Sequence, residues 1–410
     1  MPVLFLTVFV AVIPASIIMP MLPFIGQKYG ATTFEISLLF TLMPMIVIVV
    51  APIWGRLSDK YGRKPIFMAS LGASSLTFIV FGLADSLPAM FVARALQGIT
   101  GGNVSIAFAM VADSTNHENR AKYLGYTSGA MALAFFVGPM FGGLLMGTDL
   151  ETFTHTTPSI VAAGMSAVAT IIGIIFLKET RFARQSKAAV NEKALDGKAL
   201  DETSPSDINK KDVYVSPRAP VGRIGLYLII LQFLISGYIG GSDQFVFAFW
   251  AQGVHDWGPR DVSFGMATLG GGYMLATIGL VGPLTKRFDD LGAYLIGGIV
   301  NVIGLVTLLT GPNVWIAYSG LFIAVTGMGV WSTVLSSVLT KVSPEDKVGY
   351  MLGVSSGASM IGRVIGPLIA GGTFLSISYT LPFMVTLGLV LVVVANAIRV
   401  VLVQRRVASA

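Results

Sequence analysis

The stretch Gly55–Pro65 reads GRLSDKYGRKP and forms a charged turn between two long apolar runs. Four of its residues are basic and one is acidic, whereas only 12% of the whole chain is charged. Soluble domains carry about 25% charged residues, roughly twice that fraction. Because 54% of the 410 residues are hydrophobic, polar side chains cannot cover the surface of the folded chain. The sequence therefore predicts an integral membrane protein whose charges gather in a few turns.

The residue types that carry common enzyme chemistry are absent or scattered. The chain contains no cysteine, which excludes disulfides and thiolate metal sites. Its three histidines fall in predicted loops or at span ends and are not spaced as metal ligands. The sequence has neither a phosphate-binding loop nor a pair of catalytic carboxylates. We therefore predict no enzyme activity, no ATP-driven step, no cofactor and no metal site, and the scattered positive charges indicate no nucleic-acid partner.

Twelve apolar runs are long enough to cross a bilayer, which takes about 20 residues per helix. They are too long for barrel strands, and only helices or closed barrels satisfy the backbone in lipid. We expect an all-α integral membrane fold with an N-terminal six-helix bundle (1–177) and a C-terminal six-helix bundle (223–410). A flexible cytoplasmic linker (178–222), rich in charge and poor in large apolar residues, would join them. The predicted spans are 3–23, 34–54, 66–84, 88–113, 121–147, 158–177, 223–251, 262–284, 293–310, 313–339, 348–374 and 379–403.

The positive charges predict the orientation of the chain. If the N-terminus lies inside the cell, 23 of the 27 Lys and Arg residues fall in cytoplasmic segments. Only Lys28 and Arg260 would lie outside, and Arg94 and Arg363 lie within spans. An excess of Lys and Arg in inner loops is the rule for membrane proteins. We therefore expect a multi-pass, monomeric protein of the inner (plasma) membrane with both termini in the cytoplasm.

The two predicted bundles repeat a pattern at an offset of 228 residues. The fifth span of each carries a Leu-Gly frame followed by Gly-Pro, and the charged turn has a weaker counterpart at 282–292. Two parallel halves related by an axis along the membrane normal are typical of one class of secondary transporter, with the substrate site near the midplane. The matching residues are Gly125 with Gly353, Gly129 with Gly357, Gly138-Pro139 with Gly366-Pro367, and Gly143 with Gly371.

The charged turn closely resembles the loop between helices 2 and 3 of major facilitator superfamily transporters. The resemblance implies a latch that closes the inner gate in the outward-facing state, formed by an acid of the turn, a basic residue and an acid at the inner end of the fourth span. The alternative is a positive loop without a gating role. The candidate latch residues are Gly55, Asp59, Gly62, Arg63 and Asp113.

Two further motifs resemble the drug–proton antiporter branch of that superfamily, which includes tetracycline and multidrug exporters. In the fourth span, Arg94 and Gln97 match R-x-x-Q-G, although Arg94 could instead extend to the membrane interface. The fifth span resembles the antiporter signature, although it could instead be generic small-residue packing. The matching residues there are Gly125, Gly138, Pro139, Gly142 and Gly143.

The sequence departs from that branch at two positions. Ala134 replaces a glycine of the fifth-span signature, and Ala11 stands where many of those exporters carry an acid in the first span. The acid left deep in a span is Asp243, at a depth similar to that of Arg363 in the eleventh span. We expect these two residues to form a buried pair, which is either a static ion pair or one that protonation or substrate breaks.

These observations predict a secondary active transporter that works by alternating access. We expect proton-coupled efflux of a small organic molecule, in which Asp243 carries the proton. The residues expected to tune the pKa of Asp243 or to contact substrate are Arg363, Arg94 and Gln97. One alternative is a transporter of organic anions, importer or exporter, because two arginines against one aspartate leave a positive cavity. An alternative of another class is a membrane sensor or scaffold without transport. The sequence does not name the substrate.

Overall fold

The computed structural model describes residues 2–115, 117–180, 223–311, 313–343, 348–374 and 376–409. Most of the predicted linker, residues 181–222, therefore lies outside the described part of the chain. We refer to residues 2–180 as the first half and to residues 223–409 as the second half. The helices of the first half are α1 (Pro2–Ile18), η1 (Met19–Met21), α2 (Leu22–Lys28), α3 (Thr33–Tyr61), α4 (Arg63–Leu83), α5 (Leu87–Thr100), α6 (Asn103–Ser114), α7 (His117–Leu145) and α8 (Thr156–Phe176).

The second half is helical as well. Two short π-helical segments interrupt it, η2 (Leu275–Leu280) and η4 (Ala370–Phe374). Its α-helices are α10 (Arg223–His255), α11 (Pro259–Met274), α12 (Val281–Thr310), α13 (Val314–Val342), α14 (Val348–Ile369) and α15 (Leu381–Ser409).

Local sequence explains several helix ends. Thr32 caps α3 in a capping box, in which its side chain accepts from the Glu35 N–H and the Glu35 carboxylate accepts from Thr32. Asn313 caps α13 by accepting from the N–H of Ile316. Between α3 and α4 the chain turns at Gly62, which has φ 106° and ψ 148°. This left-handed region strongly favours glycine, so Gly62 fixes the turn that the sequence predicted.

Eleven helices of the described residues are long and apolar enough to cross a membrane. The longest, Pro259–Thr310, has 52 residues and covers both the eighth and the ninth predicted spans. It contains Asp289, whose φ of 58° and ψ of −176° are not helical. Counted as two helices that meet at Asp289, this segment brings the number to the twelve expected. The all-α membrane fold is confirmed.

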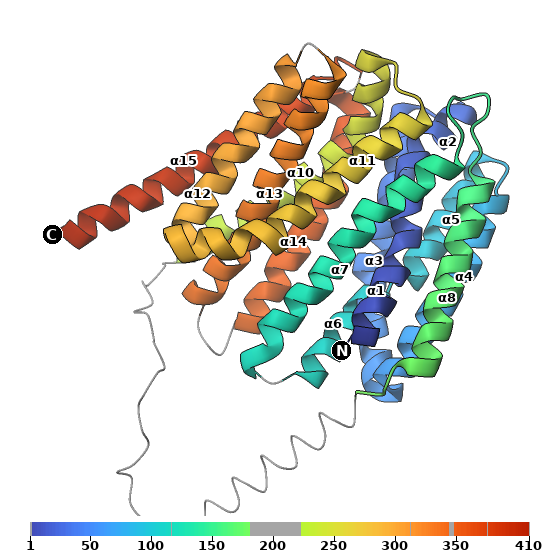
Figure 1. Ribbon diagram of the computed structural model, residues 1–410, viewed down its shortest axis with the longest axis horizontal. Helices are drawn as coiled ribbons and strands as arrows, with labels where there is room; N and C mark the ends of the chain where they lie inside the picture. The colour runs from blue at the N-terminus through green and yellow to red at the C-terminus, as the bar shows by residue number, and fades with distance from the viewer. Residues whose placement is uncertain are drawn as a thin grey trace, which may run out of the picture.

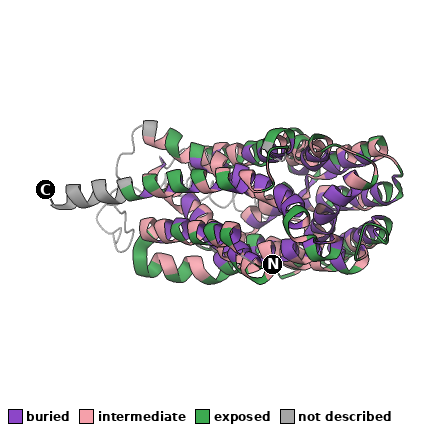
Figure 2. Cartoon of the chain, turned by 90° about the horizontal axis from the view of Figure 1, so that it is seen from above, coloured by how far each residue is buried: buried purple, intermediate pink, exposed green. Residues whose placement is uncertain are grey.

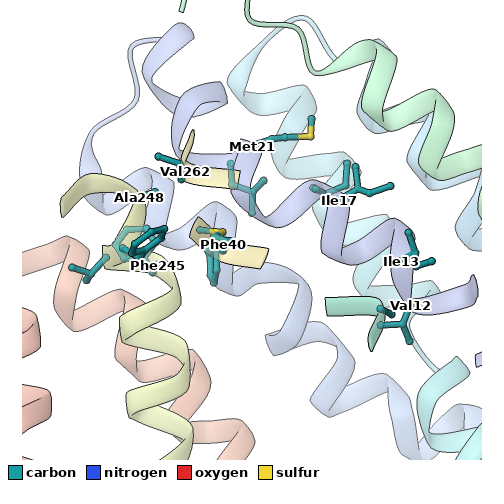
Figure 3. Close-up of a cluster of buried hydrophobic side chains, with 14 of the residues drawn as sticks. Val12, Ile13, Ile17, Met21, Phe40, Phe245, Ala248 and Val262 are labelled. Carbon is teal, nitrogen blue, oxygen red and sulfur yellow. The ribbon is translucent and has the colours of Figure 1, made fainter. Parts of the chain in front are cut away.

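The two halves lie side by side and meet along α7 and α11, and along α3 and α14 (Figure 1). Figure 3 shows part of the apolar core where they join: Phe40 of α3 lies beside Phe245 of α10, with ring centroids 5.7 Å apart. Buried residues gather between the helices, and exposed residues lie along their outer faces (Figure 2). Many exposed residues are large and apolar, such as Val49 and Phe176, as expected for a surface that faces lipid.

Candidate functional site

The charged turn between α3 and α4 gathers its ion pairs around Arg63. The Arg63 guanidinium lies 2.7 Å from the Asp59 carboxylate and 2.9 Å from the Asp113 carboxylate at the end of α6. It also donates to the hydroxyl of Ser58 at 2.7 Å. Arg63 is buried, with 6% of its surface exposed. We call Asp59, Gly62, Arg63 and Asp113 the turn cluster. The structure brings these four residues together, and it joins Gly55 to them through Ser58, because the Gly55 carbonyl accepts from the Ser58 hydroxyl at 2.8 Å.

A further member of this region was not predicted. Glu179, just beyond α8, accepts from the backbone N–H of Arg63 at 2.9 Å and from that of Lys64 at 3.0 Å. Its carboxylate therefore caps the N-terminus of α4, where Gly62 has no side chain to do so. A Cβ on Gly62 would lie 2.8 Å from this carboxylate. The only signal in the sequence was an acid directly after the sixth span.

The second half repeats the turn with the charges reversed. Asp289 has a positive φ, as Gly62 does, and follows Gly62 at an offset of 227 residues. At the same offset Asp290 replaces Arg63, and at the offset of 228 Lys341 replaces Asp113. The Lys341 ammonium lies 2.7 Å from the Asp290 carboxylate, which also accepts from Ser337 at 2.7 Å. We call Asp289, Asp290, Ser337 and Lys341 the counterpart cluster.

Arg94 lies at the junction of α5 and α3 and does not extend to a membrane interface. It is 2% exposed and donates to the backbone carbonyls of Leu39 at 3.0 Å and Phe40 at 3.3 Å. The carbonyl of Phe40 lacks its usual helical donor because Pro44, four residues on, has no N–H. Arg94 therefore supplies the donor that the proline removes from α3. Its remaining partners are the side chains of Gln97 and Met43.

The glycine-rich helix α7 contacts both halves. Gly138 and Gly142, one turn apart, pack against α1, where Gly138 meets the hydroxyl of Ser16. Gly143 faces α11, and a Cβ there would lie 2.9 Å from the Cβ of Ser263. Pro139 leaves the carbonyl of Phe135 without its helical donor, and this carbonyl packs against Gly270 of α11. Small residues thus let three helices approach closely, and the fifth-span motif lies where the halves join.

The expected Asp243–Arg363 ion pair was wrong. Asp243 instead accepts from the hydroxyl of Thr386 on α15, at 2.7 Å. The two residues do lie at the same level, because Gly241 packs against the backbone carbonyl of Arg363. Two residues along an α-helix turn the side chain by about 200°. The contact between Gly241 and α14 therefore directs Asp243 away from α14 and toward α15.

The halves pack against each other at the end of the bundle away from the turn cluster, which we call the packed end. There the amides of Gln27 and Gln252 exchange two hydrogen bonds, of 2.7 and 3.1 Å. The Thr33 hydroxyl donates to the Gly371 carbonyl at 3.0 Å. Each of these three bonds joins one half to the other across more than 200 residues of sequence. Among the described residues, no ion pair joins the two halves at the packed end.

The other end, which carries the turn cluster, is packed less closely. A Cβ on Gly125 of α7, or on Gly353 or Gly357 of α14, would meet nothing within 4 Å. These glycines lie on the same two helices that pack tightly against the opposite half at the packed end. We call this the open end. Two halves that pack closely at one end and less closely at the other have the arrangement that alternating access requires.

At the packed end, the side chains of His155 and Lys28 hold loops of the first half by contacts to backbone carbonyls. His155 is buried and its Nε2 lies 3.0 Å from the carbonyl oxygen of Ala84. Burial lowers the pKa of the His155 imidazole below its usual value, so the ring is neutral at physiological pH. Lys28 donates to the carbonyl of Phe153 at 3.2 Å. In the described part of the chain, no three His, Cys, Asp or Glu side chains gather where they could hold a metal ion.

A model of the Major Facilitator Superfamily matches residues 4–333 and 245–409 of the chain. The chain belongs to this superfamily. Its members are transporters rather than enzymes, so the protein is a multi-pass membrane transporter of small molecules.

Curated relatives within the superfamily are resistance proteins. The chain is 26% identical over 359 residues to the class H tetracycline resistance protein of Pasteurella multocida. The aligned region covers 86% of this chain and 84% of the relative. The chain is 23% identical over 375 residues to the quinolone resistance protein NorA of Staphylococcus aureus (strain MRSA252), covering 91% and 89%.

Solved structures of the superfamily share the fold. The human organic anion transporter MFSD10 (TETRAN) aligns with a TM-score of 0.68 at 18% identity, over 97% of this chain and 98% of that one. A bacterial homologue of the human lysosomal transporter Spinster, in an inward-facing and occupied conformation, aligns with a TM-score of 0.71 at 13% identity, over 97% and 95%. At these identities the likeness concerns the fold alone.

Proposed function

We propose that this superfamily member exports a small organic molecule in exchange for protons, by alternating access between its two halves. The observation that carries the proposal is the one-sided packing of the halves. Contacts such as Gln27–Gln252 and Gly143–Ser263 close one end, while a Cβ on Gly125 or Gly353 at the other end would meet nothing within 4 Å. A rocking motion that exchanges the open and packed ends would move substrate across the membrane.

The positive charges support an assignment of the open end to the cytoplasmic side. The open end carries the turn cluster and the basic residues around it, and basic loops face the cytoplasm in membrane proteins. The protein would then lie in the inner (plasma) membrane with both termini in the cytoplasm, in a state that admits substrate from inside. The resistance proteins among its curated relatives support export, and tetracycline and quinolones are the substrates to test first.

The turn cluster would control closure of the cytoplasmic end. In this state its ion pairs, Asp59–Arg63 and Arg63–Asp113, lie wholly within the first half. They hold the α3–α4 turn in one shape, with Glu179 capping α4. We place the turn as a rigid surface against which the second half docks when the cytoplasmic end closes.

Asp243 would carry the coupling proton. Its hydrogen-bond partner among the described residues is the neutral hydroxyl of Thr386, at 2.7 Å. A hydroxyl can donate to a carboxylate and can accept from a carboxylic acid, so both protonation states keep a hydrogen bond. An acid within a span is a functional candidate by default. Asp243 therefore fits a group that gains and loses a proton while access alternates.

The test is transport in proteoliposomes with and without an imposed pH gradient, using tetracycline and a quinolone. We expect the wild-type protein to move substrate against its gradient when a proton gradient is applied. Asp243→Asn should exchange substrate between the two sides at near wild-type rates but should not respond to the pH gradient. Asp149→Asn, in an exposed loop at the packed end, is the matched control and should respond as wild type. Gradient-driven transport that survives in Asp243→Asn would remove Asp243 from this role.

A further inference from the structure

The exposed residues of α14 form two stripes of different chemistry. Ile361, Ile365 and Ile369 recur every four residues, and all three are exposed. They form an isoleucine face that suits lipid. Ser356, Met360 and Arg363 form a second exposed stripe. Arg363 follows Ile361 by two residues and so points about 200° away from the isoleucine face.

The neighbours of α14 show what the second stripe faces. Gly362 and Gly366 pack against the backbone of α10, at Leu234 and Tyr238. Gly371, in η4 directly after α14, packs against Ser37 of α3, in the other half. Arg363 lies between these two contact faces: it is one residue, or about 100°, from Gly362, and about two turns before Gly371. Its side chain therefore faces the space between the halves and not the lipid.

The guanidinium of Arg363 has room and lacks a described counter-charge. Its Nη2 lies 3.8 Å from the position that a Cβ would take on Gly240, so a glycine leaves space beside it. Asp243 bonds to Thr386, and no ion pair with Arg363 occurs among the described residues. Arg94, the other arginine within a span, is already held by backbone carbonyls. A charge at this depth is costly unless a polar partner faces it.

We propose that Arg363 binds the anionic group of the transported molecule, so that the substrate class is an organic carboxylate or phosphate. The planar guanidinium can donate two parallel hydrogen bonds to either group. The proposal rests on the proposed transport function, because it assigns the substrate class of the same transport pathway between the halves. It does not depend on proton coupling, and binding in the absence of any gradient tests it.

The experiment measures binding to the purified protein in detergent by calorimetry and by thermal stabilisation. The probes are nalidixate (a quinolone-type carboxylate), salicylate and benzyl phosphate, each compared with a neutral amide or ester, together with the cation ethidium. We expect the wild-type protein to bind at least one anion about tenfold or more tightly than its neutral analogue. Loss of a charge-assisted hydrogen bond weakens binding by about that factor. Arg363→Gln should remove the preference, and Arg363→Lys should keep part of it.

Two controls separate a binding role from a structural one. The guanidinium of Arg363 makes no hydrogen bond to another described residue, so Arg363→Gln should elute as the wild-type monodisperse protein and unfold at a similar temperature. Arg287→Gln removes an exposed arginine at the open end and should leave the anion preference intact. The proposal fails if Arg363→Gln keeps the preference, if ethidium or the neutral analogues bind as tightly, or if no anion binds at millimolar concentration.

Discussion

The first half holds its turn at Gly62 through Arg63 and Asp113, and the second half holds its turn at Asp289 through Asp290 and Lys341. Both turns carry a positive φ, and both pairs reach the end of the fourth span of their own half, at α6 and at α13. The positions correspond in the repeat, yet the sign of each charge is exchanged. In both halves an ion pair therefore joins the turn to the fourth span, but the positive and negative residues have exchanged places.

The two pairs differ in their surroundings. In the first, the side chains of Arg63 and Asp113 are 8% and 9% exposed, and Glu179 and Ser58 add further bonds. In the second, the side chain of Lys341 is 65% exposed and that of Asp290 is 17% exposed. Exposed ion pairs contribute about 0–1 kcal/mol, whereas breaking a buried pair costs about 3–5 kcal/mol. We therefore expect the turn cluster to tolerate change far less than the counterpart cluster.

Exchanging the two charges within a pair should give the largest difference in stability loss between the turn cluster and the counterpart cluster. Arg63→Asp with Asp113→Arg places a carboxylate beside Asp59, with the carboxylate of Glu179 close by. We expect this double variant to lose more than about 3 kcal/mol of stability or to fail to fold. The matched exchange, Asp290→Lys with Lys341→Asp, should stay within about 1 kcal/mol of wild type. Thermal unfolding of both purified variants measures the difference, and equal losses would mean that polarity matters in both halves.

Removing the basic residue of the turn cluster should have the next largest effect. Arg63→Ala leaves Asp113 buried without its ion-pair partner and removes the bond to Ser58. We expect a loss of about 3 kcal/mol and transport well below wild type, because the α3–α4 turn loses its shape. Unfolding temperature and proteoliposome transport are the measurements. Wild-type stability in this variant would contradict a role for the pair in holding the turn.

The fold was predictable because lipid imposes strong rules on sequence. Apolar runs of sufficient length gave the spans, and the glycine and charge spacing of 55–65 located the turn. The alignment of the charged turn 55–65 with its counterpart 282–292 also pairs Gly62 with Asp289, although the sequence does not state that Asp289 takes a positive φ.

The side-chain partners were less predictable. Depth along a helix was read correctly for Asp243 and Arg363, but rotation about the helix axis depends on packing that sequence alone does not reveal. Gly241 packs against the Arg363 carbonyl, and this contact turns Asp243 toward Thr386. The bonds of Arg94 to carbonyls of α3 and of Glu179 to the start of α4 join residues far apart in the chain. The repeat itself gives no signal for either contact, so they become visible only in three dimensions.

Substitution at the two residues with positive φ, Gly62 and Asp289, should change stability by different amounts. Gly62→Ala places a side chain at φ 106° and brings its Cβ to 2.8 Å from Glu179. We expect a loss of about 1–3 kcal/mol from the backbone alone. Asp289→Gly relaxes a strained residue but removes the bond from the Gly292 N–H to the Asp289 carboxylate, at 2.8 Å. These effects oppose each other, so this variant should unfold within about 1 kcal/mol of wild type. Equal losses of stability in Gly62→Ala and Asp289→Gly would refute the argument that the positive φ of Gly62 sets the cost of substitution.

The smallest effect should come from Lys341→Ala in the counterpart cluster. The side chain of Lys341 is 65% exposed, and Asp290 keeps its hydrogen bond from Ser337 when the ammonium is removed. An exposed pair of this kind contributes less than about 1 kcal/mol, and salt screens it further. We expect a small loss of stability at low ionic strength that disappears at about 0.5 M salt, where the screening length is only about 4–5 Å.

The measurement is thermal unfolding of wild type and variant at both salt concentrations, with Lys286→Ala as the control. Lys286 is an exposed lysine near the same turn and forms no ion pair with a described acid. Its removal should show neither the loss nor the salt dependence. If Lys341→Ala instead loses as much stability as Arg63→Ala, and loses it equally at high salt, exposure does not set the strength of these pairs. The two halves would then hold their turns with equal force, and the difference between them would lie in the sign of the charges alone.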